Sequence, residues 1–360
     1  PTPAIADPGK HFKTVLYTGT NTSRSITGVG FKPGFVWTKE RDGNEVPAFY
    51  DEVREPPNVL YSSETNSEEN NAAYLYSFDD DGFTVGTGDL SNNDGGEFVA
   101  WCWKAGGATV SNTDGTLTSQ VSANQTAGFS IVKFTAQTSG TGTVGHGLGK
   151  KPAFWIYKPL TTTTGWYTYH QSLGASGWLQ FDTAAATTGN AAAWGGVEPT
   201  STVLTHGSGL INQGSCILYA WAEIEGYSKF GSFEGNGSSD GSFVYLGFKP
   251  ALVIVKQIDN VYTTGGVAGT SWGMWDSSRM PHNPAANPLW ANQSATETIR
   301  GNGSSANTGG TDGNGLGGFL YVDMLSNGFK CRTGAGEINA AGTHIYMAWA
   351  ESPFKTANAK

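Results

Sequence analysis

Two glutamates one residue apart are the sequence feature closest to a catalytic pair. Glu223 and Glu225 flank Ile224 directly after an apolar, strand-like segment. On a β-strand, residues i and i+2 face the same side about 7 Å apart, a separation at which paired acids hydrolyse glycosides. The corresponding segments elsewhere carry Trp103 and a single Glu351, so the pair does not recur. We therefore predict solvated rim acids and no catalytic residue.

The candidates for a metal site are sparse. His146 lies in a Gly-His-Gly-Leu-Gly stretch, but the six histidines show no paired ligand spacing, so we expect a turn histidine bonded to backbone. Asp79, Asp80 and Asp81 could offer oxygens to Ca²⁺, which takes six to eight of them. Residues 326–328 read Ser-Asn-Gly in the matching place, without the charges. Turn chemistry is the main prediction, a calcium site the alternative, and no cofactor is expected.

Two groups of aromatic residues are candidates for glycan or partner contact: Trp166, Tyr167 and Tyr169, and then Trp272 and Trp275. Sugars stack their C–H faces on aromatic rings, so exposed rings here would form a lectin-like surface. Alternating aromatics on a strand are more commonly half core and half interface. The sequence leaves both interpretations open.

Composition excludes several classes of function. The net charge is −9, which argues against nucleic acid as a partner because phosphate backbones need Lys and Arg. No segment approaches the roughly 18 apolar residues of a membrane helix, so we predict no membrane insertion. Cys102, Cys216 and Cys331 have no close spacing, which predicts buried free thiols. With 51 glycines, 12% aromatic and only 14% charged residues, the chain is typical of folded β-structure.

A Gly…Lys-Pro…Lys segment occurs three times with the same spacing, and its Lys-Pro pairs are residues 32–33, 151–152 and 249–250. Proline suits the first residue of a strand. The apolar run behind it does not alternate, which predicts a strand buried on both faces. The run closes with Lys39, Lys158 and Lys256, where we expect the chain to return to water.

A second shared element, an apolar segment containing tryptophan, ends each copy at residues 98–103, 217–223 and 345–351. Asp81-Gly82 and Asn327-Gly328 precede it in copies one and three. Such pairs supply the positive φ angles of two-residue hairpin turns, which favours antiparallel sheets.

These features predict an all-β fold of tandem antiparallel β-sandwich modules of jelly-roll or lectin-like type. We expect an N-terminal arm at 1–10, repeat one at 11–107, a Thr/Ser/Gly-rich linker at 108–127, repeat two at 128–226 and repeat three at 227–360. Repeats two and three meet without a linker, so they are expected to be fused, with repeat one more separate. The Gly-rich residues 301–318 predict a long flexible loop.

Several segments resemble a repeat family of tailed-bacteriophage virion proteins, frequent in marine phages and loosely described as tail-fibre or structural proteins. The resemblance rests on the Lys-Pro strand and on residues 169–174, 225–232, 327–330 and 348–360, and it spans nearly the whole chain. It implies a phage particle component with lectin-like β-sandwich modules. It supplies no catalytic residue.

On this resemblance we expect a non-enzymatic tail fibre, appendage or surface adhesion component that contacts the host. Its location would be the virion, assembled in the host cytoplasm, and its partners other virion proteins, further copies of the chain as a trimer, and a host-surface glycan. The arm at 1–10 is too small for a complete tail-attachment domain, which keeps a capsid decoration (cement) protein open or means that an upstream part is absent. A polysaccharide depolymerase is the third alternative.

Overall fold

The computed structural model describes residues 4–353 except 186–188, 260–262, 265–266, 269–270, 298–320 and 335–337. Over these ranges the chain consists of antiparallel strands, with one four-residue helix, α1 (Asp89–Asn92), and 3-10 turns at Pro8–Lys10 and Ser208–Leu210. The prediction of an all-β fold of antiparallel sheets is therefore confirmed. The expected flexible loop at 301–318 lies outside the described residues.

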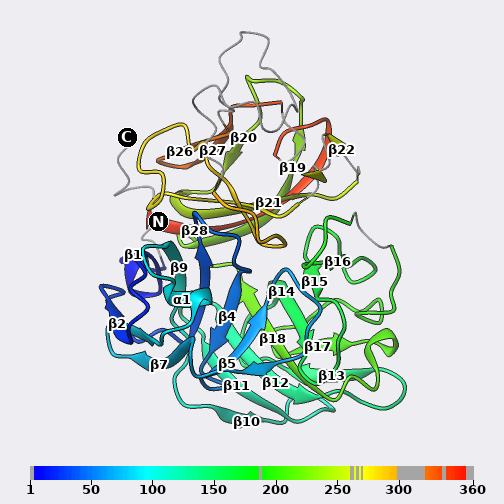
Figure 1. The fold of residues 1–360 in the computed structure, drawn as a ribbon. Helices are drawn as coiled ribbons and strands as arrows, with labels where there is room; N and C mark the ends of the chain where they lie inside the picture. Colours follow the sequence, from blue (N-terminus) through cyan, green and yellow to red (C-terminus); the bar gives the residue numbers. More distant parts are fainter. Residues whose placement is uncertain are drawn as a thin grey trace.

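Each repeat builds one main sheet with the same strand order (Figure 1). In repeat one the order is β1 (Phe12–Thr18), β9 (Glu97–Trp103), β3 (Phe35–Glu40), β4 (Ala48–Asp51), β5 (Asn58–Tyr61) and β6 (Glu69–Asn70). In repeat two it is β10 (Val110–Asn112), β11 (Ser119–Asn124), β12 (Phe129–Thr135), β18 (Ser215–Ala222), β14 (Pro152–Pro159), β15 (Tyr167–His170) and β16 (Leu179–Gln180). In repeat three it is β19 (Ser228–Gly235), β28 (Gly342–Pro353), β21 (Phe248–Gln257), β24 (Gly273–Asp276) and β25 (Leu289–Trp290). The closing strand pairs with the Lys-Pro strand on one side and with β1, β12 or β19 on the other, so the sequence repeat is also a structural repeat, and β10 and β11 are additional strands at the edge of repeat two.

A smaller outer sheet covers one face of each main sheet. Its strands are β2 (Arg24–Thr27), β8 (Gly82–Val85) and β7 (Leu75–Asp79) in repeat one, β13 (Gly142–Gly145) and β17 (Val203–His206) in repeat two, and β20 (Phe243–Tyr245), β27 (Gly328–Cys331) and β26 (Val322–Leu325) in repeat three. In addition, β22 (Thr263–Thr264) pairs antiparallel with β23 (Val267–Ala268). Apolar side chains from both sheets pack together in each repeat, which makes every repeat a small β-sandwich.

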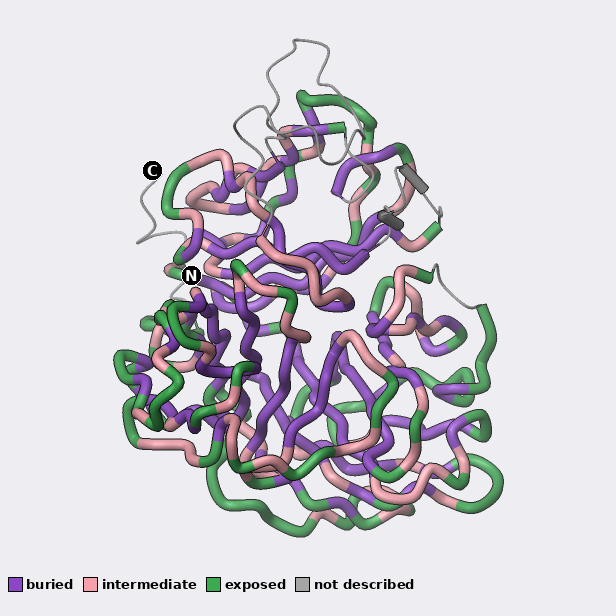
Figure 2. The backbone as a smooth tube through the Cα atoms, viewed as in Figure 1, coloured by how far each residue is buried: buried purple, intermediate pink, exposed green. Residues whose placement is uncertain are grey.

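The inner faces of the three main sheets pack against one another. One apolar cluster draws on all three repeats, and Figure 2 shows buried chain concentrated where they meet. Repeat one contributes Phe35, Trp37 and Trp103 to this cluster. The expectation that repeat one is more separate than the others is therefore wrong, because all three repeats share one core.

The linker expected at 108–127 is also wrong. β10 and β11 fall within it, and β11 pairs with β12 along its whole length, from Ser119 opposite Phe134 to Asn124 opposite Phe129. Ser119, Val121 and Ser122 are buried. Serine residues can be buried on β11 because the strands on either side supply hydrogen-bond partners for their backbone groups. Repeat two thus begins at β10, before the expected boundary.

The Lys-Pro strands are buried on both faces as predicted, since every residue of β3 and β14 is buried. Pro152 is the first residue of β14, whereas Pro250 lies inside β21 at a register shift, the other place where a strand tolerates proline.

The two hairpins expected from Asp-Gly and Asn-Gly are present, β7–β8 and β26–β27. The two residues of each turn, 80–81 and 326–327, have no positive φ, contrary to expectation, whereas Gly82, which follows the first turn, has a φ of 154°. The glycine instead opens the next strand, where a Cβ on Gly82 would lie 1.9 Å from the Ile26 carbonyl oxygen and one on Gly328 2.0 Å from that of Val244. Glycine is needed at both places because the neighbouring strand passes so close.

Candidate functional site: the junction of the three repeats

Three tryptophans meet where the inner faces of the main sheets converge. Trp103, Trp221 and Trp349 occupy corresponding positions of the closing strands, each opposite the second residue after the Lys-Pro proline. Their ring centroids are 6.0, 5.3 and 5.8 Å apart, and every pair is edge-to-face. Aromatic quadrupoles favour this arrangement, so the tryptophan triad holds one strand of each repeat to the other two.

A polar residue ends the strand beside each Lys-Pro strand: Asp51 on β4, His170 on β15 and Asp276 on β24. All three are buried. Each accepts the backbone N–H of the residue two positions later, at 3.0, 3.1 and 3.2 Å respectively. Their shared geometry shows that one structural position is filled twice by aspartate and once by histidine.

These three residues bond across the repeat boundaries. The contacts run in one direction around the junction, from Asp51 to Tyr219 Oη at 2.7 Å, from His170 Nε2 to the Tyr346 carbonyl oxygen at 3.2 Å, and from Asp276 to Trp101 Nε1 at 3.2 Å. Repeat one therefore contacts repeat two, repeat two contacts repeat three, and repeat three contacts repeat one. The ring is closed within a single chain.

An arginine three residues later clamps each aspartate. Arg54 and Arg279 donate through Nε to the same aspartate oxygen that accepts the contact from the neighbouring repeat. Their Nη2 atoms donate to the carbonyl oxygens of Phe49 and Met274, at 2.9 and 3.0 Å. The fork-shaped guanidinium can donate to a carboxylate and to a carbonyl oxygen at the same time. Each arginine–aspartate ion pair therefore fixes the turn that follows the strand.

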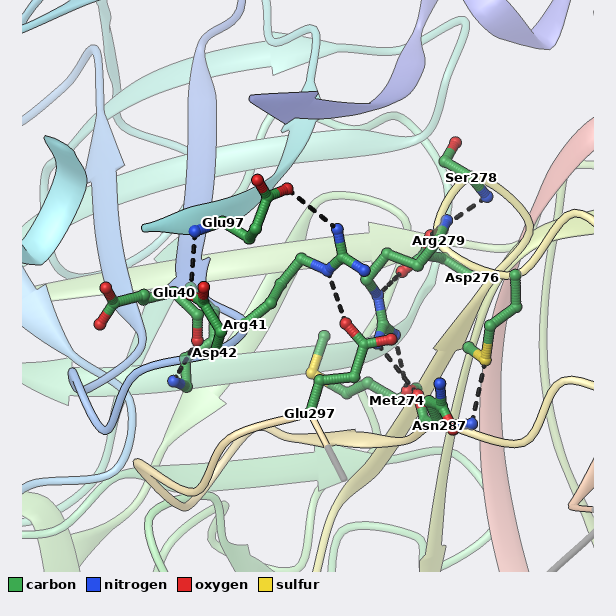
Figure 3. Close-up of polar contacts among 12 residues, drawn as sticks. Glu40, Arg41, Asp42, Glu97, Met274, Asp276, Ser278, Arg279, Asn287 and Glu297 are labelled. Carbon is green, nitrogen blue, oxygen red and sulfur yellow. Dashed lines mark hydrogen bonds and ion pairs between the residues drawn. The ribbon is translucent and has the colours of Figure 1, made fainter. Parts of the chain in front are cut away.

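A second acid approaches each guanidinium. Glu68 lies 3.2 Å from Arg54 Nη1, and Glu297 lies 3.6 Å from Arg279 Nη1. Glu297 also pairs with Arg41 of repeat one, whose Nε lies 2.5 Å from the carboxylate. Glu297 therefore links repeats one and three (Figure 3). The same arginine reaches Glu97 at 3.8 Å.

Burial and neighbouring charged groups together set the charge states at the junction. Burial alone would lower the pKa of Arg54, but Asp51, Tyr219 and Glu68 reverse this, so its pKa lies above the ordinary value. Burial lowers the pKa of His170 to about 4. Its Nδ1 accepts the Ser172 N–H, so the neutral ring carries its proton on Nε2 and donates it to repeat three.

The three closing lysines are buried, which corrects the expectation that they return to water. Lys158 donates to Thr65 O of repeat one at 2.9 Å, and Lys256 donates to Ala184 O of repeat two at 3.1 Å. Lys39 donates within its own repeat, to Glu40 O and Gly43 O. Burial lowers the pKa of Lys39 and Lys158 to about 8 and that of Lys256 to about 7. Two of these amines thus join neighbouring repeats.

Four of the aromatic residues predicted to contact glycan are fully buried, which is a further correction: Trp166, Tyr169, Trp272 and Trp275. Trp166 Nε1 donates to Tyr61 O of repeat one at 3.0 Å, and Trp272 Nε1 donates to Gln180 O of repeat two at 3.1 Å. These indoles therefore fasten each repeat to the preceding one. A ring without an exposed face cannot stack on a sugar.

The two tyrosines among the aromatic candidates lie in or near the core. Tyr169 stacks on Trp155 with centroids 3.8 Å apart, and its hydroxyl donates to Glu198. Tyr167 is half-buried beside Trp178. The interpretation of these aromatics as core and interface is the one that the structure supports.

The acids at 79–81 serve turn chemistry. Asp81 accepts N–H groups from Gly28 and Gly30, at 3.1 and 2.6 Å, and these bonds lower its pKa. Asp79 accepts from the hydroxyls of Ser77 and Thr84. Over the described ranges, no group of three or more His, Cys, Asp or Glu side chains is placed to hold a metal ion. The geometry therefore gives the calcium alternative no ligand set.

The other residues singled out from the sequence keep their expected places. Glu223 and Glu225 are exposed, beyond the end of β18 and not on a strand, and Gln171 Nε2 lies 3.4 Å from Glu223. His146 is buried, accepts the Leu148 N–H at Nδ1 and lies 3.3 Å from Thr200 O, so the prediction of a turn histidine is confirmed.

The three cysteines are buried and free, as expected. Within the described part of the chain no helix has the length and apolarity to cross a bilayer.

Sequence reasoning missed the arginine clamps, although a signal was present. Asp51 and Arg54 follow an aromatic pair, and Asp276 and Arg279 follow Met-Trp, at matching places after the Lys-Pro strand. The two acids also match: Glu68 follows the end of β5 at Tyr61 by seven residues (68 − 61), and Glu297 follows the end of β25 at Trp290 by seven (297 − 290). Aligning the three copies strand by strand reveals both recurrences.

Comparison with known proteins gives a family for this architecture. No curated protein and no solved structure matches the chain. A family model described as "Domain of unknown function (DUF7483)" matches residues 7–353, which covers all three repeats and the whole junction. The chain therefore belongs to the DUF7483 family.

Proposed function

We propose that this protein is a non-enzymatic structural component of a tailed-bacteriophage particle. The observation that carries the proposal is the closed ring of contacts at Asp51, His170 and Asp276. The buried ionisable groups of the junction fasten one repeat to the next, so their chemistry serves assembly of a rigid block. The resemblance of the repeat segments to phage virion proteins supplies the setting.

Within the particle, the proposed role is a tail fibre, appendage or surface adhesion component that contacts the host. Three sandwiches around one core form a body whose loops point outward (Figure 1). Loops on a rigid scaffold are where binding residues concentrate. The expected partners are other virion proteins. Further copies of the chain, assembled as a trimer, are also expected partners.

A capsid decoration protein is the alternative, and one observation favours it. Trp166 and Trp272, which would have formed a sugar-binding surface, instead join the repeats. A compact block that exposes neither of these rings suits a protein that clamps neighbouring capsid subunits. A polysaccharide depolymerase would depend on Glu223 and Glu225. Both of these residues are exposed to solvent, and neither lies on a regular strand.

Labelled electron microscopy of purified particles tests the proposal. Antibody raised against the full chain should decorate intact particles, at the tail tip for an adhesion component or across the head for a decoration protein. Absence of label together with absence of the chain from the proteins of purified particles would refute a structural role. Release of reducing ends from host polysaccharide, lost in Glu223→Gln, would establish the depolymerase instead.

A further inference from the structure

The outer sheet of repeat three carries two exposed aromatic residues on one face of one strand. Phe243 and Tyr245 lie at i and i+2 on β20, where Val244 between them points inward. Phe243 is 47% exposed and Tyr245 55%. Because alternate residues share a face, the two side chains leave the sheet about 7 Å apart on the same side. They form an adjacent pair of rings, the aromatic platform.

The other repeats show that the scaffold does not require these rings. The inward residues Ile26 on β2, Val144 on β13 and Val244 on β20 all lie opposite the same position of the neighbouring strand. The residues on either side are Ser25 and Thr27, both exposed, in repeat one, Thr143 and Gly145, half-buried and buried, in repeat two, and the exposed Phe243 and Tyr245 in repeat three. The same strand therefore folds with small outward residues, and exposed rings need a reason other than folding.

The platform also differs from the other exposed apolar side chains. Among the described residues these are Leu16, Tyr76, Val110 and Val197, and each lies on a different strand or loop. Single exposed apolar residues are ordinary on protein surfaces. Phe243 and Tyr245 are the one pair of exposed large apolar residues among the described residues that share a strand.

Charged side chains of both signs border the platform. Lys330 lies directly opposite Phe243 on β27, and its amine is 2.8 Å from exposed Asp240. Asp323 lies opposite Lys330 on β26 and pairs with Arg332 at 3.3 Å. Donors and acceptors therefore alternate beside the rings. This pattern suits hydroxyl groups, which both donate and accept, better than a phosphate or an acidic peptide, which would need an excess of positive charge.

Lys229 lies beside Tyr245. Its amine donates to the backbone carbonyl oxygen of Tyr245 at 2.9 Å and lies 5.3 Å from the centroid of the ring. A cation over the ring favours this placement of the side chain, which reduces the rotamer freedom that is lost when a ligand arrives.

The size of the platform decides between partners. An aromatic side chain buries about 150 to 250 Å² when it is fully covered. Because both rings are about half exposed, together they offer roughly 200 Å² of surface to a ligand. A stable protein interface buries about 800 Å² on each partner. The rings are far too small for a second copy of this chain, but they match the apolar faces of two neighbouring sugar rings.

We propose that Phe243 and Tyr245 form a saccharide-binding platform for two consecutive pyranose units, with Asp240, Lys330 and Arg332 bonding their hydroxyl groups. The inference rests on the proposed function only for the source of the saccharide, which would be the surface polysaccharide of the bacterial host. It moves the expected glycan contact from the buried aromatics of the junction to the outer sheet of repeat three.

The test is binding of the full chain to two sets of probes. One is an array of bacterial O-antigen and capsular polysaccharides, and the other contains soluble cello-, chito- and malto-oligosaccharides. The variant Phe243→Ser with Tyr245→Thr installs the residues of repeat one on the same strand, so the fold tolerates them. Tyr76→Thr removes a single exposed ring from repeat one and is the matched control.

Wild type and Tyr76→Thr should bind at least one probe equally well, and the double variant should bind it about tenfold more weakly or worse. Shifts of the ring signals of selectively labelled phenylalanine and tyrosine on adding that probe provide a measurement that needs no variant.

The proposal is overturned if wild type binds no probe or if the double variant binds as well as wild type. It is also overturned if the double variant loses attachment to a virion protein and keeps sugar binding. Because particle labelling does not depend on sugar binding, a chain found in the particle that binds no probe defeats this inference alone. A chain that binds sugar but is absent from particles defeats the proposed function alone.

Discussion

Removal of the carboxylate of Asp276 should destabilise the whole chain. Asp276 accepts the N–H groups of Ser278 and Arg279, the Arg279 Nε and the Trp101 Nε1 of repeat one. In Asp276→Ala the guanidinium of Arg279, whose side chain has no exposed surface, keeps Glu297 at 3.6 Å as its one counter-charge among the residues that the structure describes. Removing one partner of a buried ion pair costs about 3–5 kcal/mol, a large part of the roughly 5–15 kcal/mol that stabilises a typical domain.

Urea unfolding followed by tryptophan fluorescence gives this free energy directly. Asp276→Asn keeps an oxygen that accepts the backbone N–H groups, so it should lose less, about 1–3 kcal/mol. The matched control is Glu97→Ala, which removes a half-exposed acid that lies 3.8 Å from Arg41 in the same network and should cost about 0–1 kcal/mol. If Asp276→Ala costs no more than Glu97→Ala, the interpretation of the clamp as a structural tie is wrong.

Three further predictions follow from the same contacts. Burial lowers the pKa of His146, His170 and His206 to about 4, so the unfolded chain binds more protons below pH 6.5. Stability should therefore fall as pH drops from about 6.5 to 4, by up to roughly 3 kcal/mol per histidine, and a flat urea midpoint over this window would contradict it. Gly328→Ala should lose about 1–3 kcal/mol in urea because its Cβ meets the Val244 carbonyl oxygen, whereas Gly189→Ala, with open space around it, should lose little. Trp166→Phe should lose about 1–3 kcal/mol through its indole bond to repeat one while leaving any sugar binding intact, and a loss of sugar binding without loss of stability would restore the earlier glycan prediction.

Much of the fold was predictable because local patterns determine it. The Lys-Pro spacing located β3, β14 and β21, and the unbroken apolar runs correctly predicted burial on both faces. Asp-Gly and Asn-Gly located two hairpins, although the glycine serves close strand approach and not the turn angle.

The junction was not predictable from local patterns. Trp103, Trp221 and Trp349 are more than 100 residues apart in sequence, and only the packed sheets bring their rings together. For the same reason the closing lysines looked solvated. A lysine after an apolar strand normally reaches water, but in Lys158 and Lys256 another repeat supplies carbonyl oxygens for the buried amine.

The error at 108–127 has a different physical cause. Serine, threonine and glycine are common in flexible linkers. In β11 the serines lie on a strand between β10 and β12, whose pairing satisfies the backbone, and small side chains allow close packing, as the burial of Ser119 and Ser122 shows. Composition alone does not distinguish these two situations.

The central claim is that three repeats form one block around a shared core, and calorimetry of the full chain tests it most directly. A shared core predicts a single unfolding transition whose calorimetric and van't Hoff enthalpies agree. Trp103→Ala, which removes one ring of the tryptophan triad, should lower the midpoint of that one transition for all three repeats together. A separate transition for repeat one, unaffected by Trp349→Ala in repeat three, would contradict the claim.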